Sequence, residues 1–145
     1  MEQSKYLDVF IEEARENIQV VENVLLSLEE EGFDEGQMNE AFRVVHTIKG
    51  TAGVIGIEPI SELAHIMEDL FDVLRKRKET PDRSMIQLLF GGVDKIEKML
   101  DELERDGNTT LNARDLIDKM KGMRDGAPSA PSMPAPPAPE TDEIT

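Results

Sequence analysis

The chain has 145 residues, enough for one domain and a tail, and 39% of them are hydrophobic while only 4% are aromatic. Its 31 acidic and 16 basic residues give a net charge of −15, which argues against nucleic acid and anionic membrane surfaces as partners. It has no cysteine, which excludes disulfides, thiolate zinc sites and thiol nucleophiles.

The N-terminal segment, Met1 to Phe10, lacks the basic and apolar regions of a signal peptide. No stretch of the chain approaches the ~20 apolar residues that a membrane span needs. Together with the absence of cysteine, these features predict a cytoplasmic protein.

Apolar residues that recur every three or four positions predict two long helices in the first third of the chain. The first runs from about residue 4 to residue 30 and ends at Gly32. The second begins at Asp34 or Glu35 and runs to Gly53, where the glycine can end it. The apolar segment 54–57 is expected to form a short loop.

The same periodicity predicts three further helices. The third has Pro59 in its first turn, where proline is tolerated, and ends in the basic run 75–78, whose charges suit the negative end of the helix dipole. The fourth begins after residues 80–82 and is weakened in its middle by the two glycines at 91–92. The fifth spans about 112–123. Aliphatic and methionine side chains suit helix-on-helix packing, so we expect an all-α, up-and-down antiparallel four-helix bundle with an additional C-terminal helix.

The composition changes at Gly126, where a proline- and alanine-rich segment begins. Such a segment is extended and has no core of its own, so we expect a domain over residues 1–124 and a disordered linker to further domains over 125–145. The chain would then be a fragment of a larger protein. The alternative is a disordered tail on a complete small protein.

One octet, residues 46–53, is unusual for a helix because it holds His46, Lys49, Gly50 and Gly53. Each glycine costs a helix ~1 kcal/mol relative to alanine, which makes sense if another molecule must come close to the histidine. At about 100° per residue, His46 lies beyond one edge of the apolar arc, next to Phe42. We therefore predict a histidine at the rim of the helix interface.

The third helix carries a polar strip that flanks its apolar stripe, made of Ser61, His65, Glu68 and Asp72. If the second and third helices pack antiparallel, this strip can approach His46. Without further context the histidine, the lysine and the glutamate can equally be ordinary solvated residues.

A metal site is a second alternative, because Glu62 and His65 form the Glu-x-x-His element of di-iron helical bundles. Such sites need a second copy of the element, and the residue three positions before His46 is Arg43. The sequence therefore predicts no metal site.

The octet resembles the phosphoacceptor motif of histidine-phosphotransfer (HPt) domains, and most closely the branch found in CheA-type chemotaxis kinases. In that branch the histidine is followed by lysine at plus three, histidine at plus nineteen and glutamate at plus twenty-two, and by glycines at plus four, seven and ten. This chain matches at every position, and the resemblance covers about residues 4–123. The matching residues are Lys49, His65, Glu68, Gly50, Gly53 and Gly56.

The resemblance implies that His46 is phosphorylated from ATP by the kinase's catalytic domain and passes the phosphoryl group to an aspartate of a CheY-like response-regulator receiver domain. ATP and Mg²⁺ would be bound by those partner domains, and no cofactor by this one. The chain has no nucleotide-binding glycine-rich loop followed by a catalytic lysine, so it would be the substrate part of a kinase rather than the catalyst. We expect the isolated domain to be monomeric and its partner to dock on the exposed faces of the second and third helices.

The chemistry assigns roles to the other site residues. A histidine nucleophile needs one neutral ring nitrogen while the other nitrogen donates its proton to an acceptor, and Glu68 is the candidate acceptor. Lys49 can neutralise the arriving phosphoryl group, and His65 is expected to hydrogen-bond within the same cluster. Gly50 and Gly53 would remove side chains that block an incoming active site. A stand-alone phosphotransfer shuttle outside chemotaxis, or a helical adaptor without phosphoryl chemistry, are the alternatives.

Overall fold

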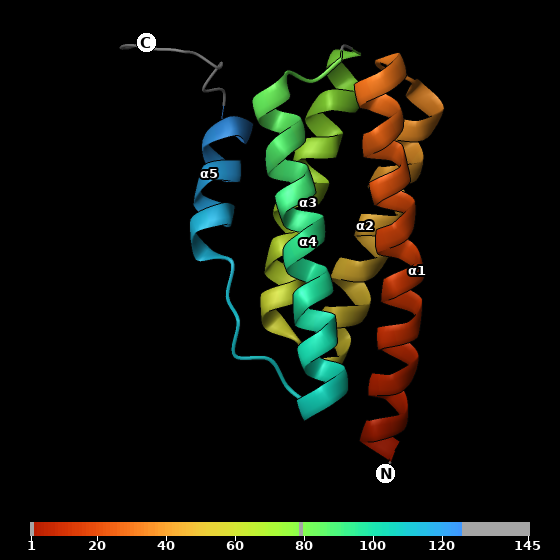
Figure 1. Cartoon of the computed structure of the whole chain (residues 1–145), viewed down its shortest axis with the longest axis vertical. Coiled ribbons are helices and arrows are strands. Elements are labelled where there is room, and N and C mark those ends of the chain that lie inside the picture. Colours follow the sequence, from red (N-terminus) through yellow and green to blue (C-terminus); the bar gives the residue numbers. More distant parts are fainter. Residues whose placement is uncertain (1, 79, 126–145) are drawn as a thin grey trace.

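The computed structural model describes residues 2–78 and 80–125, and that part of the chain folds into five α-helices (Figure 1). Helix α2 packs along α3, α1 packs against α2 and α4, and α3 also contacts α4. These contacts close α1–α4 into a bundle, and α5 lies on its outside against α3 and α4. The predicted all-α bundle with an added helix is confirmed. The helices are α1 (Glu2–Glu31), α2 (Glu35–Ile55), α3 (Glu58–Arg77), α4 (Arg83–Asp106) and α5 (Arg114–Arg124).

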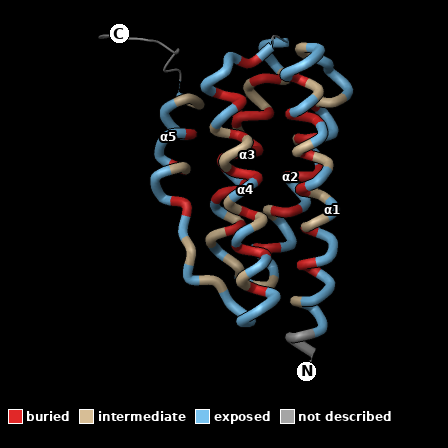
Figure 2. The backbone as a smooth tube through the Cα atoms, in the orientation of Figure 1, coloured by how far each residue is buried: buried red, intermediate tan, exposed pale blue. Residues whose placement is uncertain are grey.

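The core lies along the axis of the bundle, where one face of each long helix is buried (Figure 2). Burying each large aliphatic side chain contributes ~1.5–3 kcal/mol, so the packing of these faces stabilises the helices more than their intrinsic propensity does. None of the described helices is both long enough and apolar enough to cross a lipid bilayer. The large side chains that are fully buried include Phe71, Ile18, Leu25, Leu28, Met38, Ile48, Ile60, Leu63, Met67, Leu70, Leu89 and Ile96.

The starts of α2 and α4 follow from capping aspartates. The Asp34 carboxylate accepts a hydrogen bond of 2.8 Å from the backbone N–H of Gln37, and the Asp82 carboxylate accepts one of 2.9 Å from that of Met85. Each bond satisfies a backbone donor that the first turn of a helix otherwise leaves without a partner. The predicted starts of these two helices are confirmed.

The predicted end of the second helix at Gly53 is wrong, because α2 continues through Ile55. The turn that ends it is at Gly56, which has a φ of 83° and donates its backbone N–H to the carbonyls of Ala52 and Gly53. Glycine adopts this left-handed conformation without the steric cost of a side chain. The expected apolar loop therefore begins two residues later than predicted, and Val54 belongs to the helix.

The two glycines in the middle of α4 do not interrupt it. A Cβ atom on Gly92 would lie 2.7 Å from the sulfur of Met67 and 3.1 Å from the terminal methyl of Met120, and one on Gly91 would lie 3.4 Å from Leu116. Gly92 thus leaves room for Met67 of α3 and Met120 of α5, whereas a side chain at Gly91 would make only an ordinary van der Waals contact with α5. Helix α5 begins at Arg114 rather than near 112, and the predicted linker beyond residue 125 lies outside the described residues.

Candidate functional site

The polar contacts between α2 and α3 show that the two helices run antiparallel. Near the end of α2, the Lys49 carbonyl accepts a hydrogen bond of 3.2 Å from the hydroxyl of Ser61, near the start of α3. Near the start of α2, the Asn39 side chain accepts one of 3.4 Å from Arg75, near the end of α3. The seam between these contacts holds His46, the first residue of the octet.

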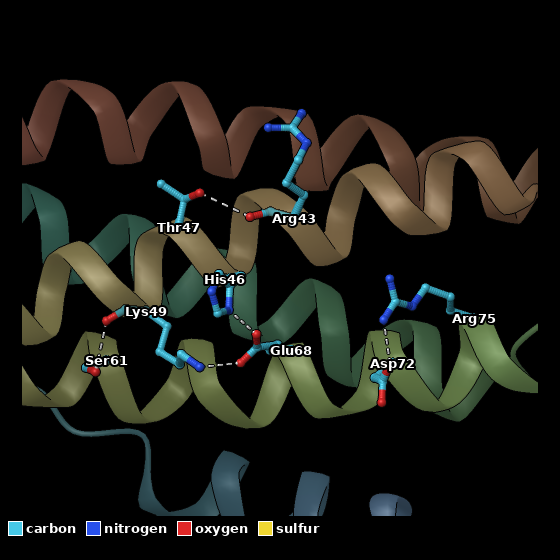
Figure 3. A network of polar contacts seen from close by, with 8 residues as sticks. All are labelled: Arg43, His46, Thr47, Lys49, Ser61, Glu68, Asp72 and Arg75. Carbon is cyan, nitrogen blue, oxygen red and sulfur yellow. Dashed lines mark hydrogen bonds and ion pairs between the residues drawn. The ribbon is translucent and has the colours of Figure 1, made fainter.

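At the middle of this seam, His46 faces Glu68 (Figure 3). The His46 ring nitrogen Nδ1 contacts Oε2 of Glu68, and the ammonium of Lys49 donates a hydrogen bond of 2.7 Å to Oε1 of the same carboxylate. The His46 side chain is 60% exposed, whereas that of Glu68 is 9% exposed. The predicted approach of Glu68 to a histidine at the rim is confirmed, whereas the predicted role of Lys49 toward a phosphoryl group stays a prediction.

Glu68 is the only buried polar or charged residue in the part of the chain that the structure describes. Burial by itself would raise the pKa of the Glu68 carboxyl, but the hydrogen bonds from Lys49 and His46 outweigh it and hold the pKa below its usual value. Glu68 is therefore ionised at neutral pH and can accept a hydrogen bond from Nδ1 of His46 when the neutral ring carries its proton on that nitrogen. That proton fixes the tautomer and leaves the lone pair on Nε2.

Lys49 lies one helical turn after His46 and is partly buried against α3, with 27% of its side chain exposed. Its ammonium is held by Glu68 on the same side of α2 as the histidine. A charge that is already in place can stabilise an incoming anion without the free-energy cost of reorganisation. The site thus combines an exposed imidazole, a buried carboxylate that contacts it and a cation held in place by that carboxylate.

The two glycines of the octet have different surroundings. A Cβ atom on Gly50 would meet nothing within 4 Å, so the surface one turn after His46 is open. A Cβ atom on Gly53 would lie 3.5 Å from the hydroxyl of Ser61, so this glycine faces α3. The surroundings of Gly50 suit the predicted clearance for a partner, and the same role for Gly53 stays a prediction.

An apolar groove of about 670 Å³ lies beside His46, between the first part of α1 and the second half of α2. Its most exposed apolar side chains are Tyr6, Val9 and Val54, which are 62%, 50% and 87% exposed. Exposed apolar surface gathered in one groove is typical of a protein-binding site. The complete lining is Tyr6, Val9, Phe10, Glu13, His46, Thr47, Gly50, Thr51, Val54 and Ile55.

His65 lies one turn before Glu68 on α3, but it is exposed and faces a cleft of about 320 Å³ that α5 helps to form. Among the described residues, His65 makes no hydrogen bond to His46, Lys49 or Glu68, so its predicted hydrogen-bonding role stays a prediction. Candidate ligand atoms of His65, Glu68 and Asp69 lie within 4.8 Å of one another. Glu68 is already bound by Lys49 and His46, and Asp69 forms an ion pair of 2.8 Å with Arg124, so this group is not set up for a metal.

Sequence reasoning missed two features next to the histidine. One is the contribution of α1 to the groove, for which the only sign was that Tyr6 and Val9 stand three residues apart, off the apolar stripe of that helix. The other is a stack of Phe42 on the His46 ring, with the guanidinium of Arg75 over the ring of Phe42. Helical spacing places Phe42 beside His46, but nothing in the spacing indicates Arg75 from another helix.

The fold and the site define a histidine-phosphotransfer domain: the model of the Hpt domain family matches residues 5–106, and the chain belongs to that family. The match covers α1–α4 and leaves α5 outside. Within the family, the chain is similar to the chemotaxis protein CheA of Halobacterium salinarum, with 35% identity over 120 residues. The alignment covers 83% of this chain and 18% of that protein, so the chain spans less than a fifth of the relative's length.

Two solved structures show the same fold. One is the solution structure of the histidine phosphotransfer domain of CheA, with a TM-score of 0.75 and 32% identity, covering 90% of this chain and 98% of that one. The other is the phosphorylated P1 domain of CheA3 in complex with CheY6 from R. sphaeroides, with a TM-score of 0.75, covering 83% of this chain and 96% of that one. At 22% identity, the second likeness concerns the fold alone.

Proposed function

We propose that this domain carries a phosphoryl group on Nε2 of His46, receives it from ATP through the catalytic domain of a CheA-type histidine kinase, and passes it to an aspartate of a receiver domain. The observation that carries the proposal is the arrangement of His46, Glu68 and Lys49 in a chain of the Hpt family. An adaptor without phosphoryl chemistry has no need for a buried carboxylate that orients an exposed imidazole.

In the first step, the Nε2 lone pair of His46 attacks the γ-phosphorus of ATP, the bond from that phosphorus to the bridging oxygen breaks, and ADP leaves. The ring becomes more positive as the new bond forms, and the Glu68 carboxylate at Nδ1 stabilises that charge. In the second step, a receiver aspartate oxygen attacks the phosphorus and the N–P bond breaks. The electron pair returns to Nε2, and His46 is ready to accept again.

Lys49 has its role in the phosphorylated state. The phosphoryl group adds nearly two negative charges at neutral pH to a chain whose net charge is already −15. The Lys49 ammonium, one turn from His46, offsets part of that charge while remaining paired with Glu68. ATP and Mg²⁺ belong to the partner domains in this proposal, and a cytoplasmic location follows from the need for ATP.

We place the receiver on the apolar groove between α1 and α2 rather than on the faces of α2 and α3 that the sequence suggested. The groove includes His46 in its wall, and Gly50 leaves its surface open next to the histidine. A phosphorylated P1 domain of the same fold has been crystallised with CheY6, which supports a receiver as the occupant. A receiver bound in the groove would be placed directly next to Nε2.

Incubation with ATP and the isolated catalytic domain of a CheA-type kinase tests the proposal. We expect acid-labile, base-stable phosphate on the wild-type domain and on His65→Gln, and none on His46→Gln. The His65 variant is the matched control because it removes the other histidine of the chain. Labelling that survives in His46→Gln would contradict the proposal, as would the absence of labelling in the wild type with several such kinases.

The groove gives a separate prediction about the second step. Val9→Asp should slow transfer from the phosphorylated domain to a CheY-like receiver by about tenfold, because it places a charge in the apolar contact. Leu26→Asp is the control, since Leu26 lies on the same helix with a similar exposure of 46% but outside the groove. Rapid-quench measurement of phosphate loss gives both rates. Equal rates of transfer for the two variants would contradict this placement and show that the receiver binds another surface.

A further inference from the structure

Phe42 packs against the nucleophilic histidine from the preceding turn of α2. The two rings are nearly parallel, with an interplanar angle of 10° and 6.3 Å between their centroids. This separation lies within the range of offset-stacked aromatic pairs, and residues four apart on a helix are neighbours. The contact is to the face of the imidazole, whereas Glu68 contacts its edge at Nδ1.

Arg75 also lies over the ring of Phe42. Its guanidinium carbon lies 3.9 Å from the ring centroid, well inside the distance of a cation–π contact. Arg75 comes from α3, so the Phe42 ring is held between its own helix and the neighbouring one. Figure 3 shows Arg75 reaching from α3 toward α2, further along the seam from His46.

The position of Arg75 is fixed by two acceptors. Arg75 donates a hydrogen bond of 2.7 Å to the Asp72 carboxylate and one of 3.4 Å to the Asn39 side chain. The pKa of the Asp72 carboxyl is lower than usual, mainly because of the hydrogen bond from Arg75. The ammonium of Lys76, 3.0 Å from the other oxygen of that carboxylate, lowers it further. These contacts limit the freedom of the guanidinium, and therefore of the ring beneath it.

The histidine needs a second contact because its side chain is largely exposed. A hydrogen bond at Nδ1 fixes the position of one atom but leaves the plane of the ring free to tilt about that atom. In-line attack on phosphorus requires that the Nε2 lone pair point toward the phosphorus, and small errors in orientation lower the rate steeply. A parallel ring against one face removes the tilt.

We propose that Phe42 and Arg75 are positioning residues that set the plane of the His46 ring and thereby the direction of Nε2. The effect on rate rests on the proposed function, whereas the effect on the ring does not. Neither residue exchanges a proton or contacts the phosphoryl group in this account. Phe42 acts on His46 through its face, and Arg75 acts through Phe42.

The test compares Phe42→Leu, which keeps apolar packing but removes the stack, with Phe42→Tyr, which keeps the aromatic ring. In proton NMR spectra, we expect the signals of the His46 ring protons to move in Phe42→Leu, because the ring current of Phe42 is lost, and to stay near their wild-type positions in Phe42→Tyr. Phosphorylation by the kinase domain should slow by about three- to tenfold in Phe42→Leu and recover in Phe42→Tyr. Circular dichroism checks that both variants are folded.

Arg75→Met tests the outer member of the pair, with Arg77→Met as the control that removes an equal charge from an exposed position on the same helix. We expect the His46 ring signals to move in Arg75→Met, by less than in Phe42→Leu, and to stay in place in Arg77→Met. His46 ring signals that do not move in Phe42→Leu would overturn the proposal, as would a shift without any change in phosphorylation rate. If the wild type accepts no phosphoryl group, the proposed function fails, and the ring signals still decide whether Phe42 orients His46.

Discussion

Glu68→Gln is expected to slow phosphorylation of His46 by about 100-fold or more while leaving the fold intact. Glutamine has nearly the same shape as glutamate, so the packing of this buried side chain changes little. Its amide cannot supply the negative charge that stabilises the ring as the N–P bond forms, and its NH₂ group can donate to Nδ1 and so favour the wrong tautomer. The rate of phosphate incorporation from ATP with the kinase domain measures the effect.

Glu62→Gln serves as the control for this substitution. Glu62 is another carboxylate on α3, and it forms an ion pair of 3.5 Å with Arg114. Its loss should leave the phosphorylation rate close to that of the wild type. A Glu68→Gln domain that is phosphorylated as fast as Glu62→Gln would remove Glu68 from the mechanism.

Lys49→Met is expected to slow phosphorylation by about ten- to 100-fold and to make the reaction more sensitive to acid. The substitution removes a strong hydrogen bond to Glu68 but leaves the carboxylate buried, so the pKa of Glu68 should rise. In the wild type that pKa lies below its usual value, so Glu68 stays ionised as the pH falls into the acidic range. In the variant, protonation of Glu68 begins at a higher pH.

The same reasoning gives the sign for stability. Because the pKa of Glu68 is lower in the folded chain than in the unfolded chain, ionised Glu68 stabilises the fold above its unfolded pKa, and this contribution is lost as the pH falls through the folded pKa. Lys49→Met should therefore move the acidic limb of both the rate profile and the unfolding profile to higher pH. Lys98→Met, which breaks an exposed ion pair with Asp94 on α4, is the control. Identical acidic limbs for the two variants would contradict the role given to Lys49.

The sequence was enough to predict the bundle and the pairing of His46 with Glu68, because both depend on regular helical spacing. Apolar periodicity located all five helices, and the polar strip of α3 identified the side chain that would face the octet. The end of α2 was misjudged because two glycines competed for the role. Only Gly56 has the left-handed backbone that ends the helix, and local sequence does not distinguish it from Gly53.

What the sequence could not show depends on contacts between distant segments. The groove joins Val9 of α1 to Val54 of α2, and the two residues share no periodicity. Likewise, Arg75 reads as one of several basic residues that suit the end of α3, and only the packed structure places it over Phe42. Gly92 read as a weak point in α4, whereas it gives Met67 and Met120 room to pack.

The central claim is that Nε2 of His46 carries the phosphoryl group while Nδ1 keeps its proton for Glu68. Phosphorus and nitrogen NMR of the nitrogen-15-labelled domain, recorded after incubation with ATP, Mg²⁺ and the kinase domain, tests this claim most directly. We predict a single phosphoramidate in which phosphorus is coupled to Nε2 of His46. Phosphorus bonded to Nδ1 of His46, or to a nitrogen of His65, would contradict the account.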